Sequence, residues 1–376
     1  MQLPNRSLTP LALAGAVLPF DGLLQLAHWV FEWLMPFLHW LSGMDSAVWQ
    51  QHAPALWTLP LALLGIAWLL APRGIPGRAL GLVLMAPLFA VAPRGPQPGE
   101  LWLTVLDVGQ GLAVLARTQN HALLYDAGPM WSAQADSGNR IILPYLRGEG
   151  VTRLDVLAIS HNDNDHVGGA RSVLAAVVTD RLVSSVPPER LPESQVRYRL
   201  PCTAGQRWEW DGVKFAWLHP TVEQLAAASQ RVPGQRAGRR ADRRAEKPND
   251  LSCVLRIEAY GRSVLLTGDI EKTAEAALIE RGEKLAADVL IVPHHGSGTS
   301  STPEFVAAVS PKHAVFPVGY RNRFGHPKTE VWQRYVASGA KRERSDRDGA
   351  VSFRFTSAGI VVERQRERNR RYWQGR

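Results

Sequence analysis

Apolar residues in the larger, second part of the chain fall in short runs that predict β-strands. Three runs follow one another closely, at Leu101–Val108, Leu112–Arg117 and His121–Asp126, with Gly109-Gln110-Gly111 as the first turn. Helices interleave with these and later strands, which indicates a layered α/β domain with its sheets packed inside. Later strands are expected at Leu154–Ile159, Val213–His219, Ser252–Ala259, Ser263–Thr267 and Val289–Pro293, and helices near Asn139–Gly148, Glu271–Arg281 and Pro303–Val309.

Residues 1–94 have a different pattern, because apolar residues dominate and charges are few. Apolar runs cover Pro10–Leu41, Ala55–Ala71 and Ala79–Ala92. The last two runs are at or below the shortest length that spans a bilayer, and the turn between them predicts a helical hairpin. We expect residues 1–94 to be membrane helices, with tryptophans at the interface. A cleaved signal peptide and buried helices of a water-soluble protein are the alternatives.

The few charges in this region predict its orientation. Arg73 and Arg78 lie in the hairpin turn, whereas the loop at 42–54 carries only Asp45. The positive-inside rule places the turn in the cytoplasm, and the chain after Arg94 therefore outside the cytoplasm, on the opposite face of the membrane. In that compartment the two cysteines, Cys202 and Cys253, can form a disulfide.

The net charge of +9 is concentrated in two segments. A basic insertion at about 225–248 contains seven basic and two acidic residues between Arg231 and Lys247, and the tail at 363–376 contains six basic and two acidic residues. Both are expected to be flexible. Such segments attract polyanions such as nucleic acid or anionic lipid, and equally occur as solvated linkers.

The loop after the strand at 154–159 carries the chemistry. It reads Ser-His-Asn-Asp-Asn-Asp-His-Val-Gly-Gly, with His161, Asp163, Asp165 and His166 within six residues. Two imidazoles and two carboxylates on one tight loop at a strand end suit metal ligation, while a solvated polar loop is the alternative.

Two further strand ends supply partners for this loop. Asp269 ends the strand Leu-Leu-Thr-Gly-Asp, where it could bridge two cations or cap the helix that follows. His294 and His295 follow the strand at 289–293. Loops at strand carboxyl ends are where α/β folds build sites, so these side chains are expected to meet.

The order of these motifs closely resembles one family. Leu-Asp-Val-Gly-Gln-Gly (106–111), Leu-Leu-Tyr-Asp-Ala-Gly (123–128), the His/Asp loop, Asn-Asp-Leu-Ser-Cys-Val-Leu (249–255), Leu-Leu-Thr-Gly-Asp, Pro-His-His-Gly-Ser and Val-Gly-Tyr-Arg-Asn-Arg-Phe-Gly-His-Pro (318–327) occur in sequence. They resemble the metallo-β-lactamase-like domain of the ComEC family of DNA-internalisation competence proteins. The resemblance covers about residues 55–362. It implies an αββα sandwich at 95–362, two divalent metal ions at one edge, and DNA passage across the inner membrane.

The resemblance also implies roles for individual residues. It pairs His161 with Asp163 at one metal and Asp165 with His166 at the second, with Asp269 bridging. His294 or His295 would complete the set. Support around the ligands, or contacts to substrate, are implied for Asp107, Gln110, Asp126, Asn249, Ser252, Ser297 and Asn322.

This chain departs from the family pattern in three ways. Asp163 stands where the superfamily usually has a second histidine, and Asn249 replaces another unless His219 takes its place. More carboxylate makes a harder site, so Mn²⁺ or Mg²⁺ competes with Zn²⁺. Most of the family's multi-helix channel is absent from this sequence. The chain is therefore expected to be a fragment of a longer channel protein, the product of an alternative start or a minimal paralogue, and a partner could supply the channel.

The expected activity is metal-dependent cleavage of DNA phosphodiesters. Two adjacent cations generate a nucleophile from water and stabilise the phosphodiester oxygens. Asp165 would orient that nucleophile, and His326 would contact phosphate or protonate the leaving group. His326 could instead be an ordinary loop histidine. The substrate is expected to be DNA as a single strand, and other competence proteins are expected partners. A domain that guides DNA without cutting it, or that hydrolyses another phosphodiester, is the alternative.

Overall fold

The structure is a computed structural model that describes residue 13 and residues 21–44, 51–72, 74–191, 196–229 and 248–370. Its contacts divide the chain into two units, Met1–Gln51 and His52–Arg376. Most of the basic insertion expected at 225–248 lies outside the described residues.

The described part of the N-terminal unit includes the long helix α2 (Gly22–Ser42), which contains Pro36. Its apolar surface is interrupted by an ion pair between His28 Nε2 and Glu32 Oε1, which are 3.2 Å apart. Among the described residues, no helix is both long enough and apolar enough to cross a membrane.

The second unit begins with the expected helical hairpin, formed by α3 (Thr58–Leu69) and α4 (Leu80–Ala90). Glycines allow the two helices to approach closely, since a Cβ atom on Gly65 would lie 2.5 Å from the carbonyl oxygen of Gly81. Arg78 closes the turn by donating from Nη2 to the Leu69 carbonyl at 2.6 Å. With 12 and 11 residues, each helix is about 18 Å long or less, well short of a bilayer core of about 30 Å.

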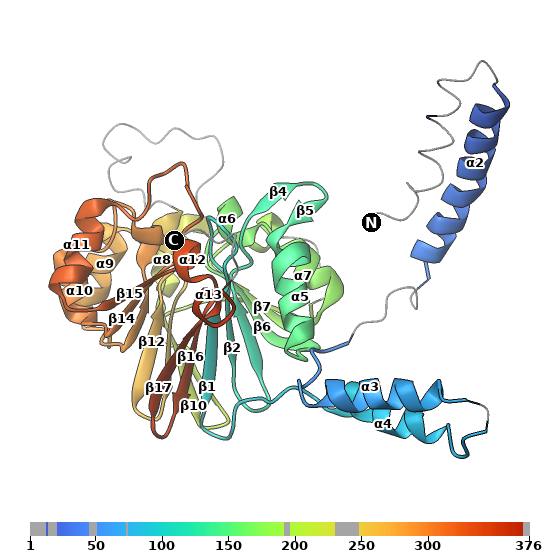
Figure 1. The fold of residues 1–376 in the computed structure, drawn as a ribbon. Coiled ribbons are helices and arrows are strands. Elements are labelled where there is room, and N and C mark those ends of the chain that lie inside the picture. The colour runs from blue at the N-terminus through green and yellow to red at the C-terminus, as the bar shows by residue number, and fades with distance from the viewer. Residues whose placement is uncertain are drawn as a thin grey trace. The chain divides into compact units, whose positions relative to one another are not determined.

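Two large mixed sheets follow (Figure 1). The first has eight strands in the order β17 (Gly359–Arg364), β16 (Val351–Thr356), β1 (Leu101–Val105), β2 (Val114–Arg117), β3 (Ala122–Tyr125), β6 (Arg153–Ile159), β7 (Val178–Ser184) and β8 (Tyr198–Pro201). The second has seven, in the order β15 (Lys341–Arg344), β14 (His313–Phe316), β13 (Val289–Ile291), β12 (Arg262–Leu266), β11 (Val254–Ala259), β10 (Val213–His219) and β9 (Arg207–Trp210). A small ribbon pairs β4 (Met130–Ser132) with β5 (Ala135–Asp136).

Helices cover the outer face of each sheet (Figure 1). The first sheet is covered by α5 (Leu143–Gly148), which continues the π-helical turn Gly138–Ile142, and by α7 (Ala170–Ala176). The second is covered by α9 (Lys272–Glu280), α10 (Pro303–Val309) and α11 (Thr329–Ala337). Further helical segments of the described residues are α6 (Asn164–Val167), α8 (Val222–Ser229), α12 (Ser345–Asp348), α13 (Gln365–Arg368) and the 3₁₀ turns Pro188–Arg190, Asn249–Leu251 and Pro293–Gly296.

Three apolar layers hold this arrangement together. Side chains from both sheets form the central layer, for example Val114 and Tyr125 from the first and Phe215 and Leu255 from the second. Leu115 points the other way, into the layer beneath α5 and α7. Central strands buried on both faces read as continuous apolar runs, which is why the sequence revealed them. The result is an αββα sandwich, as expected.

The sequence pattern located the central elements more reliably than the peripheral ones. β10 and α10 have the predicted bounds, while β7 to β9 and β14 to β17 were not predicted. The segment at 363–376 was expected to be a flexible tail, but its beginning belongs to β17 and α13. Register with β16 and an ion pair between Arg364 and the buried Glu343, 2.9 Å apart, hold it in place.

Candidate metal centre

The loops that carry the predicted chemistry meet at one end of the sandwich. β3 runs parallel to β6 in the first sheet, and β12 runs parallel to β13 in the second. Parallel strands end at the same edge, so the loops after these four strands bring together Asp126, the His161–His166 stretch, Asp269 and the His294-His295 pair. α6, which carries Asp165 and His166, lies at this end between the two halves (Figure 1).

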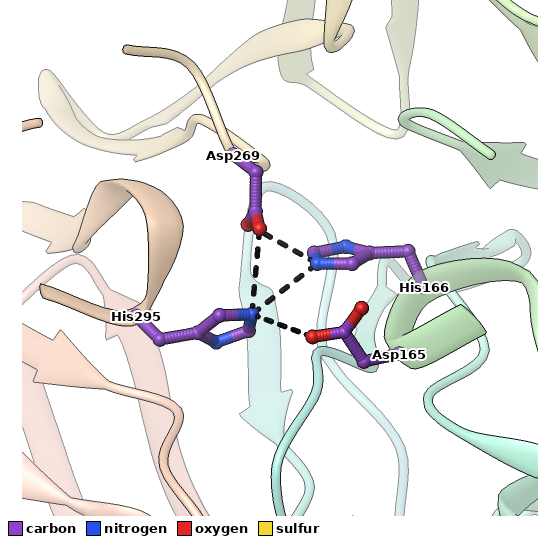
Figure 2. A group of neighbouring side chains, drawn as sticks. All are labelled: Asp165, His166, Asp269 and His295. Atoms are coloured by element: carbon purple, nitrogen blue, oxygen red, sulfur yellow. Dashed lines mark hydrogen bonds and ion pairs between the residues drawn. The ribbon is translucent and has the colours of Figure 1, made fainter. Parts of the chain in front are cut away.

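Four side chains direct their ligand atoms at one point (Figure 2). They are Asp165, His166, Asp269 and His295, and one ligand atom of each lies within 4.8 Å of the others. His166 Nε2 is 3.1 Å from Asp269 Oδ1, and His295 Nε2 is 3.3 Å from Asp165 Oδ2. Two imidazole nitrogens and two carboxylates form a donor set that suits Zn²⁺ or Mn²⁺.

Each imidazole of this cluster is oriented by a contact at its Nδ1 atom, on the side of the ring away from the cluster. His166 Nδ1 lies 2.7 Å from Asp126 Oδ2, and His295 Nδ1 lies 2.8 Å from the Pro317 carbonyl oxygen. Such oxygens act as acceptors, so each Nδ1 donates and each Nε2 faces the cluster. The two Nε2 atoms are 3.3 Å apart, and each also lies near a carboxylate oxygen of the cluster, so one cation could contact both rings.

The electrostatics of the cluster indicate a site that needs positive charge. Burial would raise the pKa of Asp269, but the charges of His166 and His295 outweigh burial and hold this pKa well below its ordinary value. Burial would lower the pKa of His166, yet Asp269 and Asp126 raise it well above its usual range. The pKa of His295 is likewise raised, by Asp269 and Asp165 against the effect of burial. A divalent cation in the cluster would balance the negative charge of the carboxylates, as protons on the two histidines do without it.

A second group of donors adjoins the first and shares Asp269. His161 Nε2 lies 3.5 Å from Asp163 Oδ2 and 4.0 Å from Asp269 Oδ2. His294 Nε2 also lies near the same Asp269 oxygen, at 3.7 Å. The Nε2 atom of His161 is buried and has no hydrogen-bond partner among the described residues. An orphaned nitrogen aimed at two carboxylates fits a second metal ion, with Asp269 placed between the two positions.

The two neighbouring histidines therefore have different places. His295 belongs to the four-residue cluster, whereas His294 adjoins that cluster through Asp269 Oδ2. Both residues have positive φ, 50° for His294 and 55° for His295, and this unusual backbone turns their rings to different sides. His294 Nδ1 also lies 3.2 Å from Thr299 Oγ1, which in turn contacts Ser297 Oγ at 3.1 Å.

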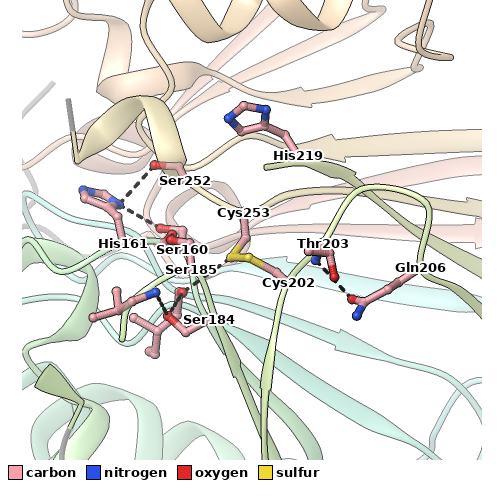
Figure 3. The surroundings of a disulfide bond; sticks show 12 residues. Ser160, His161, Ser184, Ser185, Cys202, Thr203, Gln206, His219, Ser252 and Cys253 are labelled. Atoms are coloured by element: carbon pink, nitrogen blue, oxygen red, sulfur yellow. Dashed lines mark hydrogen bonds between the residues drawn. A yellow bond between two sulfur atoms is a disulfide. The ribbon is translucent and has the colours of Figure 1, made fainter. Parts of the chain in front are cut away.

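Two serines form the floor beneath the ligands (Figure 3). Ser160 Oγ donates to Asp126 Oδ2 at 2.8 Å and lies 3.0 Å from His161 Nδ1. Ser252 Oγ lies 3.3 Å from the same Nδ1 and accepts from the Asp269 amide at 3.2 Å. Ser252 was predicted from the resemblance, but Ser160 and the Pro317 carbonyl were not. Ser160 could have been found from the sequence because it directly precedes His161. The Pro317 carbonyl could not, because a backbone group leaves no signal in the sequence.

The structure separates other expected residues from the ligand cluster. His219 is buried, and its Nε2 donates to the Asp250 carbonyl at 2.6 Å, so it fixes the turn at Asn249–Leu251. Burial lowers the pKa of His219 to about 4, against the effect of that carbonyl. Asn249 begins the turn and accepts from the Ser252 amide through its backbone oxygen. Asp269 does not cap α9, because the N-cap position belongs to Glu271.

The remaining predicted residues lie on two loops beside the cluster. Asp107 pairs with Arg366 at 2.8 Å, and Gln110 accepts from the Gly319 amide at 3.3 Å. Asn322 braces the loop after β14 by accepting from the His326 amide and donating to its carbonyl. The His326 ring lies 6.2 Å from that of His294, and its Nδ1 is buried without a hydrogen-bond partner among the described residues.

The two cysteines form a disulfide close to the candidate ligand His161 (Figure 3). Cys202 follows β8 of the first sheet, Cys253 precedes β11 of the second, and their Cα atoms are 5.9 Å apart. Cys253 is next to Ser252, so the bond joins the two sheets directly beside the floor of the site.

Comparisons with known proteins agree with this geometry. A family described as the Metallo-beta-lactamase superfamily matches residues 106–320. Competence protein ComA of Neisseria gonorrhoeae is 37% identical over 373 residues, which are 98% of this chain and 48% of that protein. Recombination protein 2 of Haemophilus influenzae is 34% identical over 261 residues, which are 69% of this chain and 30% of that protein. The chain thus spans about half or less of the length of these relatives.

Solved structures show a distant similarity. The metallo-beta-lactamase fold protein YhfI of Bacillus subtilis is 12% identical, with a TM-score of 0.41 over 70% of this chain and 99% of that one.

Proposed function

Because this chain belongs to the ComEC/Rec2 family of competence protein homologues and has a metallo-beta-lactamase domain, we propose that it is a metal-dependent hydrolase that cleaves DNA phosphodiesters during DNA uptake. The observation that carries this proposal is the convergence of Asp165, His166, Asp269 and His295, with His161 and Asp163 adjoining through Asp269. A shared carboxylate between two donor groups is the arrangement that a two-metal phosphodiesterase requires.

The residues present would hold two divalent ions, Zn²⁺ or Mn²⁺, with Mg²⁺ also suited to the carboxylates. When bound, these ions would supply a nucleophile from water and stabilise negative charge on the phosphate oxygens. Asp165 is the ligand of the four-residue cluster with the most exposed side chain, so its carboxylate is placed to orient the attacking water. His166 and His295 are fixed by Asp126 and Pro317 and keep their positions through the reaction.

His326 is placed to contact the substrate phosphate. Burial lowers its pKa to about 4, and the neighbouring His295 and His294 act in the same direction. The ring is therefore neutral at pH 7, and a neutral ring favours a hydrogen bond to a phosphate oxygen over proton donation to the leaving group.

The proposal includes a place in the cell. We propose attachment to the inner membrane with the sandwich on the periplasmic side, and partnership with other competence proteins or with a channel-forming portion. The disulfide supports this location, because such bonds persist in oxidising compartments. The exposed apolar side chains of the α3–α4 hairpin, such as Leu63 and Val83, support contact with lipid.

Cleavage assays on the full chain test the proposal. Purified protein treated with EDTA is given Mn²⁺, Zn²⁺ or Mg²⁺ and incubated with end-labelled single-stranded or duplex DNA. We expect cleavage only with metal, and loss of at least about a thousandfold in rate for Asp165→Ala, since removing a ligand disables a two-metal site. Glu304→Gln, an exposed acid on α10, serves as the matched control. DNA binding without cleavage under every metal condition would favour a domain that guides DNA, and hydrolysis of other phosphodiesters alone would exclude DNA as the substrate.

A further inference from the structure

The loop between β14 and α11 presents two exposed aromatic rings beside the metal centre. We name residues 319–327 the rim loop. Its Tyr320 and Phe324 are 71% and 46% exposed, although large apolar rings usually gain by burial. Single exposed apolar residues are common on proteins, so exposure alone indicates nothing. Here the exposed rings share one short loop with two arginines, Arg321 and Arg323. This loop lies beside the site proposed for phosphodiester hydrolysis.

The rim loop is tied to the metal centre at both ends. At its start, Gly319 packs on Gln110 so closely that a Cβ atom would lie 2.7 Å from the Gln110 nitrogen. At its end, the Lys328 amide donates to the Gly296 carbonyl at 2.9 Å, next to His295. The loop is therefore held at one end against the turn that carries Gln110 and at the other end against the backbone next to His295.

The loop is also braced internally. Asn322 Nδ2 donates to the carbonyls of Gly319 and His326, at 3.2 and 2.8 Å, and its Oδ1 accepts from the His326 amide at 2.9 Å. Lys328 Nζ donates to the Phe324 carbonyl at 2.8 Å. Arg321 adopts a left-handed backbone with φ of 51°, which costs energy and persists because these bonds hold it. The rings are thus presented on a preformed surface.

Aromatic rings continue from the metal centre to the exterior. The His326 ring lies 6.2 Å from His294, and Phe324 stacks on His326 with centroids 5.8 Å apart and planes inclined by 10°. The outer end of this row is open to solvent at Phe324. A chain of nucleotides that leaves the metal centre along this row would meet stacking surfaces at successive positions.

The charges of the rim loop suit an anionic polymer. Arg321 and Arg323 are exposed, and neither has an acidic partner among the described residues. Each guanidinium lies over its neighbouring ring, 5.2 Å from the centre of Tyr320 and 4.9 Å from that of Phe324. Rings that stack bases, alternating with arginines that take phosphates, are the common means by which proteins hold single-stranded nucleic acid.

From these observations we propose that the rim loop is the binding site for single-stranded nucleic acid, with Tyr320 and Phe324 stacking unpaired bases and Arg321 and Arg323 holding the phosphates beside them. This inference rests on the proposed function and adds the feature that selects a single strand over a duplex. Bases in a duplex are stacked on one another and offer no free face to the loop.

Equilibrium binding without metal tests this inference separately from catalysis. The full chain in EDTA is titrated against a fluorescein-labelled thymidine 12-mer and a duplex of equal length, and anisotropy is recorded. We expect the parent protein to prefer the single strand. Tyr320→Ala/Phe324→Ala should weaken single-strand binding about tenfold for each ring removed and leave duplex binding nearly unchanged. The variant with rings exchanged, Tyr320→Phe/Phe324→Tyr, should bind as the parent does, because both rings still stack.

A matched control pair exists on β8 and just before it. Arg197 lies 5.2 Å over the ring of Tyr198, which is 47% exposed, so Arg197→Ala/Tyr198→Ala removes a similar exposed pair from outside the rim loop. It should leave binding unchanged. Arg321→Gln/Arg323→Gln should reduce the slope of log affinity against log salt by about 0.7 for each phosphate that an arginine no longer neutralises.

Several results would overturn the inference. These are the absence of single-strand binding by the parent, equal losses for single strand and duplex in the alanine double variant, or unchanged single-strand binding in that variant. Retained oligonucleotide binding with lost binding to phosphatidylglycerol vesicles would assign the loop to a lipid surface instead. A ribonucleotide 12-mer distinguishes RNA from DNA as the preferred strand. Because no metal is present, failure of cleavage in the earlier assay leaves these outcomes intact.

Discussion

The carboxylate of Asp126 and the imidazole of His166 form a fully buried pair, 2.7 Å apart, next to the four-residue cluster of candidate ligands. Asp126 also accepts from the Ser160 amide at 2.7 Å, and it occupies a left-handed backbone with φ of 59°. With the bond from the Ser160 hydroxyl at 2.8 Å, three interactions on this one residue fix both the ring of His166 and the start of the loop that carries His161.

We expect Asp126→Asn to lower metal affinity about 10- to 100-fold, because a residue that orients a ligand contributes that much in known metal sites. Isothermal titration with Mn²⁺ or Zn²⁺ measures this. Asp155→Asn is the matched control, since Asp155 pairs with His121 Nδ1 at 3.0 Å outside the cluster. Equal affinities for the two variants would show that Asp126 serves the fold alone.

Metal binding should release protons and strengthen as pH rises. Asp269, together with Asp126 at His166 and Asp165 at His295, raises the pKa of both rings against the effect of burial, so protons compete with metal for these nitrogens up to a higher pH than at ordinary histidines. A cation must displace them, and each proton released increases the affinity with pH. Titration calorimetry in buffers of different ionisation enthalpy counts the protons. An affinity independent of pH between 6 and 8 would contradict this account.

Removal of the disulfide should lower the free energy of unfolding by about 2 to 5 kcal/mol, because the bond closes a long loop. Cys202 and Cys253 are 51 positions apart and join the two sheets. Urea denaturation of the full chain with and without dithiothreitol measures the change. The Cys202→Ser/Cys253→Ser variant should have the reduced stability in both conditions, and a response of that variant to dithiothreitol would point to another cause.

His219 should make the fold less stable as pH falls from about 6.5 to about 4. Burial lowers its pKa to about 4 in the folded protein, so the unfolded chain takes up the proton first and unfolding is favoured across this window. Above pH 6.5 His219 is neutral in both the folded and the unfolded protein, so it does not lower the free energy of unfolding. By about pH 4 its protonation in the unfolded chain has lowered that free energy by about 3 kcal/mol. His219→Gln keeps a donor for the Asp250 carbonyl but does not titrate. Its stability should fall less steeply with acid than that of the parent; parallel curves would contradict the prediction.

Much of the site was determined by the sequence itself. Strands buried on both faces, such as β6 and β12, are continuous apolar runs, and a ligand loop that directly follows such a strand is fixed locally. His161, Asp163, Asp165 and His166 could therefore be named together, and the rule that parallel strands end at one edge indicated that Asp269 and the His294-His295 pair would join them.

The tertiary structure decided what depends on contacts between distant segments. His294 and His295 are adjacent in sequence and chemically identical, and only the Pro317 carbonyl and the turned backbone direct His295 to Asp165. In the sequence, either Asn249 or His219 could stand at the position of one histidine of the superfamily pattern. The structure separates His219 from the candidate ligands, because its ring is buried and donates to the Asp250 carbonyl. β15 and β17 were not predicted because they are partly exposed and carry charges, and Arg364 reaches Glu343 only when the two sheets have packed together. Local pattern records which residues a strand end carries, whereas the direction in which each side chain points is set by partners that the fold brings from elsewhere.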